Sequence, residues 1–329
     1  MAILVLGAAG YIGSHMVDTL VNDDQDVVAV DNLGRGHQSA VNRCARFYQG
    51  DVRDKAFMGN VFSKEKIDAV IHFCAYSIIP ESLKEPLKYF DNNVSGLITL
   101  LEVMNQFSVK KLVFSSSAAV YGVPHENSIS ENEDKNPINP YGQTKLMMEK
   151  IMKWADKAYG IKWVALRYFN VAGAKLDGSI GEDHRPESHL IPIVLQAALG
   201  IRDHVDRCGN DYQTRDGYNV RDYVHVLDLT NAHVLALHYL NDGGQSIQFN
   251  VGSSHGFTVK EIIDAARRVT HKKIVAVDAP RRGGDPDSLV ADSSKIESVL
   301  NWKRKYGDMD TIIGSAWNWM NKHPNGFED

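Results

Sequence analysis

Gly7-Ala8-Ala9-Gly10-Tyr11-Ile12-Gly13 is the stretch of sequence that decides the fold. It follows an apolar run at 2–6 and opens a helical pattern at 11–21. Glycines in GxxGxxG spacing allow a tight turn, close approach of the backbone to a pyrophosphate, and close packing of helix on strand. The free N–H groups of the helix start attract an anion. We therefore predict a dinucleotide-binding turn containing Gly7, Gly10 and Gly13; a purely structural turn is the alternative.

The same alternation of strand and helix continues through the first half of the chain. Helices are expected at about 86–107 and 141–159, and apolar runs predict strands at 26–31, 45–48, 67–73, 111–115 and 163–168. Continuous apolar strands separated by helices are typical of a parallel sheet covered on both faces. The predicted fold class is α/β, a doubly wound parallel Rossmann sheet with a smaller C-terminal α/β substrate-binding region.

This rhythm fades near residue 171, so we place a boundary there. We expect an NAD-binding Rossmann domain at 1–170 and a substrate-binding region at 171–329. The run at 247–251 has the pattern of a strand that could return to the first sheet. The second region is therefore not expected to be strictly contiguous.

Asp31 ends the second predicted strand, where a carboxylate accepts hydrogen bonds from the ribose hydroxyls of a dinucleotide. A negative charge there repels a 2′-phosphate, which favours NAD over NADP. Arg35 lies nearby and is the one feature that weakens this preference.

Tyr141 and Lys145 stand four residues apart, so a helix places them on one face. A free tyrosine has a pKa near 10, and a neighbouring ammonium favours its phenolate form. Ser117 lies where the fifth predicted strand ends, at the edge of the sheet that binds ligands. We predict that Ser117, Tyr141 and Lys145 are catalytic, with Tyr141 as the base.

Composition narrows the function further. The 329 residues carry a formal net charge of −5, with 43% hydrophobic and 23% charged residues. This mild acidity, without a basic cluster, argues against nucleic acid or a membrane surface as the partner. No apolar run is long enough to cross a bilayer. Three cysteines without CxxC spacing favour reduced thiols and a cytoplasmic location.

Together these motifs resemble the UDP-glucose 4-epimerase family, in the extended short-chain dehydrogenase/reductase superfamily of NAD-dependent epimerases and dehydratases. The resemblance is carried over nearly the whole chain by 7–15 (GAAGYIGSH), 30–36 (VDNLGRG), 50–54 (GDVRD), 71–77 (IHFCAYS), 115–122 (SSSAAVYG), 139–145 (NPYGQTK), 167–174 (RYFNVAGA), 180–184 (IGEDH), 220–228 (VRDYVHVLD) and 279–286 (APRRGGDP). It implies tightly bound NAD, interconversion of UDP-galactose and UDP-glucose through a 4-keto sugar, and a homodimer formed by the helices at 86–107 and 141–159.

The resemblance also implies individual roles. Besides the three glycines and Asp31, the cofactor contacts would be Tyr11, Ile12, Asn32, Leu33, Gly34, Arg35, Gly36, Asp51, Val52, Phe73, Cys74, Ala75, Tyr76, Ser77, Asn92, Ser115, Tyr141, Lys145 and Phe169. The substrate contacts would be Ser117, Tyr141, Asn170, His189, Leu190, Arg221, Arg282, Asp285 and Leu289. Ser77 replaces a lysine of many members, His189 stands where others have asparagine, and Leu289 occupies a position beside the sugar that varies in size.

Three other interpretations remain. The enzyme could be a UDP-N-acetylglucosamine or UDP-glucuronate 4-epimerase, or the fold could serve a non-catalytic NAD-sensing regulator.

A group of acidic and histidine residues lies close together in the sequence: Glu182, Asp183, His184, Glu187 and His189. They lack the HExxH spacing of a metal site. We therefore expect no metal there, but a solvated or substrate-binding loop.

Overall fold

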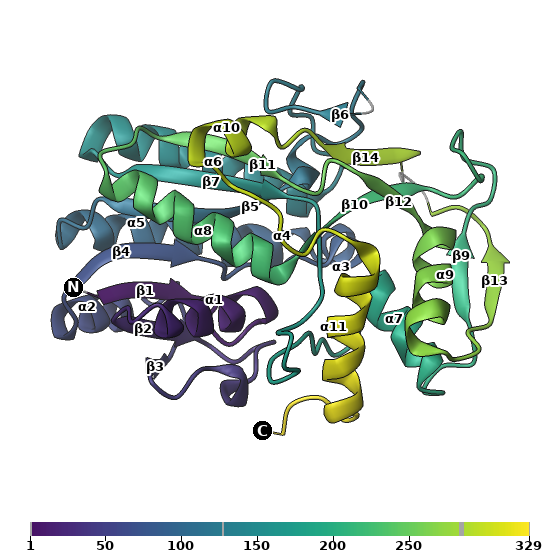
Figure 1. The fold of residues 1–329 in the computed structure, drawn as a ribbon. Coiled ribbons are helices and arrows are strands. Elements are labelled where there is room, and N and C mark those ends of the chain that lie inside the picture. The colour runs from purple at the N-terminus through teal and green to yellow at the C-terminus, as the bar shows by residue number, and fades with distance from the viewer. Residues whose placement is uncertain (1, 127, 283–285, 329) are drawn as a thin grey trace.

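A seven-stranded parallel sheet forms the larger part of the molecule (Figure 1). The computed structural model describes residues 2–126, 128–282 and 286–328. Across the sheet the strands run in the order β11-β7-β5-β4-β1-β2-β3. Their bounds are β1 (Ala2–Leu6), β2 (Val27–Asp31), β3 (Arg46–Gln49), β4 (Ile67–His72), β5 (Lys111–Ser117), β7 (Lys162–Tyr168) and β11 (Ile247–Val251). The strand order reverses between β1 and β4, and ligands bind at such a switch point in open α/β sheets. The predicted Rossmann fold class is confirmed.

Helices cover both faces of this sheet, because its strands are apolar on both sides. One core contains side chains of α1 (Tyr11–Asn22), α8 (Val226–Asn241) and α10 (Ser294–Leu300). The other contains side chains of α2 (Lys55–Lys64), α5 (Gly96–Gln106) and α6 (Pro140–Tyr159). In Figure 1, α1 and α8 lie side by side in front of the sheet. The strand β11 is contributed by residues far beyond 171, and pairs with β7 along five residues.

The prediction of one helix over 86–107 is wrong in its middle. Short helices α3 (Ile79–Lys84) and α4 (Pro86–Tyr89) are followed by a π-helical turn, η2 (Phe90–Ser95), before α5 begins. A π turn inserts an extra residue and is frequent at functional sites. Here it presents two adjacent asparagines, Asn92 and Asn93, which are both buried.

The smaller region has short strands and its own core. One sheet has the order β12-β10-β14-β6, with β8 paired to β10, and a second consists of β13 and β9. The strands are β6 (Ser128–Ile129), β8 (Asn170–Ala172), β9 (Val205–Cys208), β10 (Val220–His225), β12 (Gly256–Thr258), β13 (Ala276–Ala279) and β14 (Ser288–Ala291). The helices α7 (Leu190–Ala198), α9 (Val259–Thr270) and α11 (Met309–Lys322) pack together over them. Two 3₁₀ turns, η1 (Gln38–Ala40) and η3 (Ala118–Val120), complete the described elements.

A buried polar network ties α6 to the sheet. Arg167 on β7 forms a two-point ion pair with Glu149 on α6, with N···O distances of 2.6 and 2.9 Å. Both side chains are at most 4% exposed. Ser116 on β5 donates a hydrogen bond to Glu149, and Arg167 donates another to Tyr121. The charges are therefore neutralised inside the protein.

None of the helices in the described part of the chain has the length and apolar character needed to span a membrane.

Candidate active site

The glycine turn after β1 has the geometry that its spacing predicts. Gly7 has a φ of +75°, and a Cβ at this residue would lie 2.6 Å from the backbone nitrogen of Cys74. A Cβ on Gly13 would lie only 1.9 Å from the carbonyl oxygen of Gly7. The first helical hydrogen bond of α1 runs from the N–H of Ser14 to the carbonyl of Gly10. The preceding N–H groups therefore face the end of the helix, where an anion binds favourably.

Asp31 lies directly beside this turn. Its carboxylate accepts hydrogen bonds from the N–H groups of Ala9 at 3.0 Å and Leu33 at 2.8 Å. Burial raises the pKa of Asp31. Gly36 packs against Ala9, because a Cβ there would lie 2.6 Å from the carbonyl carbon of Ala9. A carboxylate fixed at a glycine turn has the chemistry that a dinucleotide ribose requires.

Arg35 is paired with other side chains, so it does not support a preference for NADP. Its guanidinium donates to Glu81 at 2.6 Å and lies 5.4 Å from the ring centroid of Tyr76. On the other side of the loop, Asn32 donates to Asp51 at 3.1 Å. The neighbouring Arg53 guanidinium holds the pKa of Asp51 well below its usual range.

The segment after β4 is held by a residue that the sequence analysis missed. Asn93 accepts a hydrogen bond from the N–H of Tyr76 at 2.8 Å and donates to its carbonyl at 3.1 Å. Asn93 also donates to the hydroxyl of Thr144 on α6 at 3.0 Å, and Asn92 donates to the side-chain oxygen of Asn93. The signal was an Asn-Asn pair inside a run otherwise predicted as an apolar helix. The predicted residues Phe73, Cys74, Ala75 and Tyr76 follow β4 in this segment and are half-buried, whereas Ser77 is exposed.

The three residues predicted to be catalytic lie at the carboxyl edge of the sheet. Ser117 is the last residue of β5, and its side chain is near enough to the buried Tyr141 phenol to influence the pKa of that phenol. The start of α6 positions Tyr141, because Asn139 caps the helix by accepting from the N–H of Gly142 at 2.8 Å. One turn later, Lys145 is 1% exposed and donates to the carbonyl of Ser115 at 2.7 Å.

Burial has the largest effect on the electrostatics of this group. It raises the pKa of the Tyr141 phenol, and the Ser117 side chain offsets only part of that increase. Burial lowers the pKa of Lys145 to about 8. Its Nζ is 5.9 Å from the centroid of the Tyr141 ring. Desolvation is therefore the largest influence on the Tyr141 phenol in the protein without its cofactor, and the effect of Lys145 on this phenol stays a prediction.

The predicted substrate residues lie around β8, β10 and β14. Asn170 donates to the carbonyl of Asp222 at 3.0 Å, and Arg221 donates to the carbonyl of Pro286 at 3.0 Å. Leu289 packs in an apolar cluster with Phe169 and Ala118, the residue after Ser117. The structure therefore brings Leu289 and the Ser117 strand end together. Arg282 is exposed, Leu190 is half-buried at the start of α7, and Asp285 lies outside the described residues.

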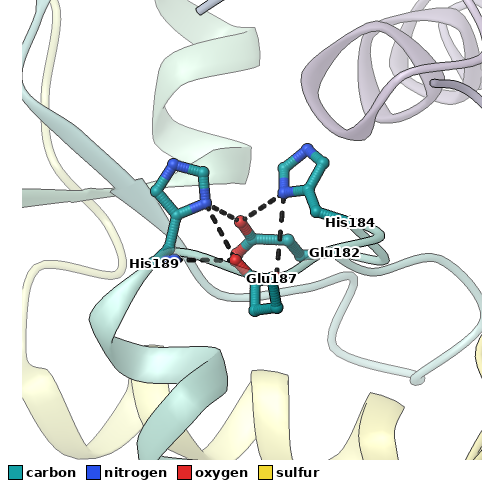
Figure 2. A group of neighbouring side chains, drawn as sticks. All are labelled: Glu182, His184, Glu187 and His189. Carbon is teal, nitrogen blue, oxygen red and sulfur yellow. Dashed lines mark hydrogen bonds and ion pairs between the residues drawn. The ribbon is translucent and has the colours of Figure 1, made fainter. Parts of the chain in front are cut away.

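A compact cluster forms in the loop before α7, from Glu182, His184, Glu187 and His189 (Figure 2). Glu182 and Glu187 have side chains only 7% and 4% exposed. The expectation of a solvated loop is therefore wrong for these two carboxylates. Burial acts to lower the pKa of His189, but the charges of Glu182 and Glu187 outweigh it and raise the pKa to about 10.

Comparisons with known proteins agree with this geometry. The NAD dependent epimerase/dehydratase family matches residues 3–252. A UDP-glucose 4-epimerase of Lacticaseibacillus casei is 60% identical over 329 residues, covering 100% of this chain and 99% of that protein. A crystal structure of a UDP-glucose 4-epimerase has a TM-score of 0.99 at 52% identity, with 100% of both chains covered. The Bifidobacterium longum UDP-glucose 4-epimerase, solved with NAD+ and UDP, has a TM-score of 0.94 at 39% identity, with 99% of this chain and 100% of that chain covered.

Proposed function

The chain belongs to the NAD dependent epimerase/dehydratase family, and from this premise we propose that it is a UDP-glucose 4-epimerase. It interconverts UDP-galactose and UDP-glucose through a 4-keto sugar, with NAD as its cofactor. One observation carries the chemistry, namely that the buried Tyr141 phenol and the buried Lys145, which donates to the carbonyl of Ser115, lie at the sheet edge where β5 ends at Ser117. A hydroxyl pair in that position can move a proton to and from a sugar alcohol.

In this mechanism Tyr141 takes the proton of the sugar 4-hydroxyl, with Ser117 linking the two oxygens. When bound, NAD supplies the hydride acceptor and donor at sugar C4, together with a positively charged nicotinamide ring. Burial disfavours the phenolate of Tyr141 in the protein alone, so the base depends on added positive charge nearby. Lys145 holds the cofactor ribose, and its bond to the carbonyl of Ser115 fixes its position. Tyr141 then returns the proton when the sugar is reduced on its other face.

The substrate residues are proposed for the UDP moiety. Arg221 and Arg282 neutralise the diphosphate, because guanidinium groups match phosphate geometry. Asn170, His189, Leu190 and Asp285 hold the remainder of UDP, and Leu289 lies beside the hexose. We assign residues 1–170 to NAD binding and 171–329 to UDP-sugar binding, with β11 returned to the first sheet.

The proposed assembly is a homodimer formed by the stretches 86–107 and 141–159. Exposed apolar side chains in these stretches support it: Leu87 is 80% exposed, Ile98 43% and Trp154 69%. Leu87→Glu should convert the dimer to a monomer by light scattering, whereas Leu176→Glu, at a 48% exposed leucine elsewhere, should not. A Leu87→Glu protein that remains dimeric would contradict this interface.

We also propose a cytoplasmic location. Cys44, Cys74 and Cys208 are all free thiols, and reduced thiols persist in a reducing compartment.

The test of function uses purified protein with no added nucleotide. Incubation with UDP-galactose should yield UDP-glucose, and the denatured protein should release close to one NAD per chain, because a redox-neutral cycle has no need to exchange its cofactor. Substoichiometric NAD together with activity that requires added NADP would contradict the assignment and the role of Asp31. Failure to epimerise any UDP-sugar would favour the non-catalytic NAD-sensing regulator.

The alternative substrates are not favoured. The full-length relatives with 52–60% identity carry the name UDP-glucose 4-epimerase. Parallel incubations with UDP-N-acetylglucosamine and UDP-glucuronate should therefore give lower kcat/KM than UDP-galactose.

A further inference from the structure

The cluster before α7 has a geometry that its ion pairs alone do not require. Both histidines direct the same ring atom, Nδ1, at the carboxylates (Figure 2). For His184, Nδ1 lies 3.0 Å from Glu182 and 3.8 Å from Glu187. For His189, the corresponding distances are 2.7 and 3.2 Å. One nitrogen from each histidine and one carboxylate oxygen from each glutamate lie within 4.8 Å of one another.

These separations match a tetrahedral coordination shell. Zinc binds histidine nitrogen and carboxylate oxygen at about 2.0–2.2 Å, so neighbouring ligand atoms in a tetrahedron lie about 3.4 Å apart. The four nitrogen–oxygen distances of 2.7–3.8 Å, which involve one oxygen of Glu182 and both oxygens of Glu187, lie on either side of that value. We propose that Glu182, His184, Glu187 and His189 form a binding site for one divalent transition-metal ion of the Zn²⁺ type. Two imidazoles and two carboxylates form a donor set suited to such an ion.

Burial and charge favour a cation at this centre. The carboxyl groups of Glu182 and Glu187 lie in a place with little solvent, where a carboxylate charge requires a partner. A divalent ion neutralises both carboxylates and leaves the imidazoles in the neutral form that binds metals.

The surroundings hold the ligands in orientation. Glu187 accepts from the N–H groups of Ser188 at 2.6 Å and His189 at 2.7 Å. The His184 ring stands edge-on to Tyr11 of α1, with centroids 6.3 Å apart. The backbone carbonyl of Glu182 accepts from the indole of Trp319 on α11 at 3.3 Å. Such outer contacts tune metal affinity.

The site is structural rather than catalytic, because four protein ligands leave the ion no position for substrate or water. The ion would use Nδ1 of His189, which leaves the other ring nitrogen for the contact with UDP proposed above. The side chain of His189 is 53% exposed, so a metal ion would reach the cluster from solvent on this side. The ion would bind the loop to the start of α7, where His189 and Leu190 lie. It would thereby stiffen one wall of the proposed UDP-sugar site.

Direct metal binding tests this proposal without any measurement of epimerase activity. Untagged protein with its NAD is treated with chelator, then dialysed against Zn²⁺ and analysed for metal. We expect one Zn²⁺ per chain, and visible d–d absorption of tetrahedral Co²⁺ when cobalt replaces zinc. His184→Gln and Glu187→Gln should each weaken Zn²⁺ binding at least ~100-fold, beyond the roughly 10–100-fold typical of lost outer contacts.

The matched control is His204→Gln. His204 pairs with Asp206 at 3.3 Å on the surface and is not part of the cluster, so its loss should leave the stoichiometry at one. Zn²⁺ should also raise the melting temperature of the wild type and leave that of His184→Gln unchanged. A cooperative melting transition of His184→Gln shows that this variant is folded. Wild type without stoichiometric Zn²⁺, or His184→Gln that binds as tightly as wild type, would overturn the proposal.

Discussion

The large sheet and the smaller region around β10 present their ligand-binding groups in different ways. In the large sheet the proposed dinucleotide turn is formed by backbone at the end of a buried strand, where Gly7 and Gly13 leave no room for a side chain. In the smaller region, strands of two to six residues carry the proposed contacts on side chains, such as Arg221 and Leu289. The turn of the large sheet that is proposed to bind NAD therefore tolerates little change in its backbone. In the smaller region, proposed to bind the UDP-sugar, substitution of single side chains can change substrate specificity.

The largest effect is expected at Tyr141, at the start of α6 on the large sheet. Tyr141→Phe should lower kcat at least ~100-fold, the usual scale for loss of a positioned base. UDP affinity should stay nearly unchanged, because only one oxygen is removed. Ser117→Ala should be milder, since water can replace one hydroxyl. Tyr159→Phe, at the exposed end of the same helix, is the control. Near wild-type turnover in Tyr141→Phe would remove tyrosine from the mechanism.

The buried network of the large sheet gives the second prediction. Glu149→Gln leaves the Arg167 charge unpaired inside the protein, and removing one partner of a buried ion pair costs about 3–5 kcal/mol. The free energy of unfolding in urea measures this loss. In the smaller region, Arg268 pairs with Asp310 at the surface. Arg268→Gln should leave the urea midpoint almost unchanged, and equal losses in both variants would contradict the comparison.

The glycine turn gives a smaller effect. Gly13→Ala places a methyl group 1.9 Å from the carbonyl oxygen of Gly7 and forces α1 away from β1. We expect a loss near the upper end of about 1–3 kcal/mol for overpacking, with less NAD retained on purification. Gly59→Ala in α2 is the matched control, because its Cβ meets nothing within 4 Å. There alanine should stabilise by about 0.5–1 kcal/mol through helix propensity. Full NAD retention in Gly13→Ala would mean that the turn adapts.

The smallest effect concerns specificity in the substrate half. UDP-N-acetylglucosamine should be turned over measurably but less efficiently than UDP-glucose and UDP-galactose, because leucine at 289 leaves room for the acetamide. A pocket difference of a few methylenes is worth about 1–3 kcal/mol. Leu289→Tyr should abolish the N-acetyl activity and largely spare the plain hexoses. The measurement is kcat/KM for both sugars in both proteins, and an unchanged ratio would show that Leu289 does not line the sugar pocket.

The sequence predicted the large sheet well, since most of its strands are runs of apolar residues with a helix or turn on either side; β3, with Arg46 and Gln49 at its ends, is the exception. It missed the short strands of the smaller region, because β6, β8 and β12 have only two or three residues each and no readable alternation. It also missed the π turn at 90–95, since the apolar pattern of α4 and α5 continues across it. Both failures arise where tertiary contacts, rather than local pattern, determine the backbone.

The candidate site shows the same division. Positions of Gly7, Asp31, Ser117 and Tyr141 could be inferred, because strand ends and helix spacing place them. Their electrostatics could not, since the raised pKa of Tyr141 comes from burial that spacing does not reveal. The irregular sequence spacing of Glu182, His184, Glu187 and His189 likewise gave no signal that these side chains form a cluster. The four side chains come together because the loop bends, and not because they share a helical spacing.

The late return of β11 affects how the chain folds as it leaves the ribosome. When β7 has been synthesised, its outer edge has no neighbour, and its partner is still unmade until Val251 has emerged. During that interval an unpaired parallel edge is available to other chains. α8, which covers the same strands, is also synthesised in this interval. A gene truncated after residue 170 would make this open edge permanent, so such a fragment should aggregate rather than fold as an independent NAD-binding unit.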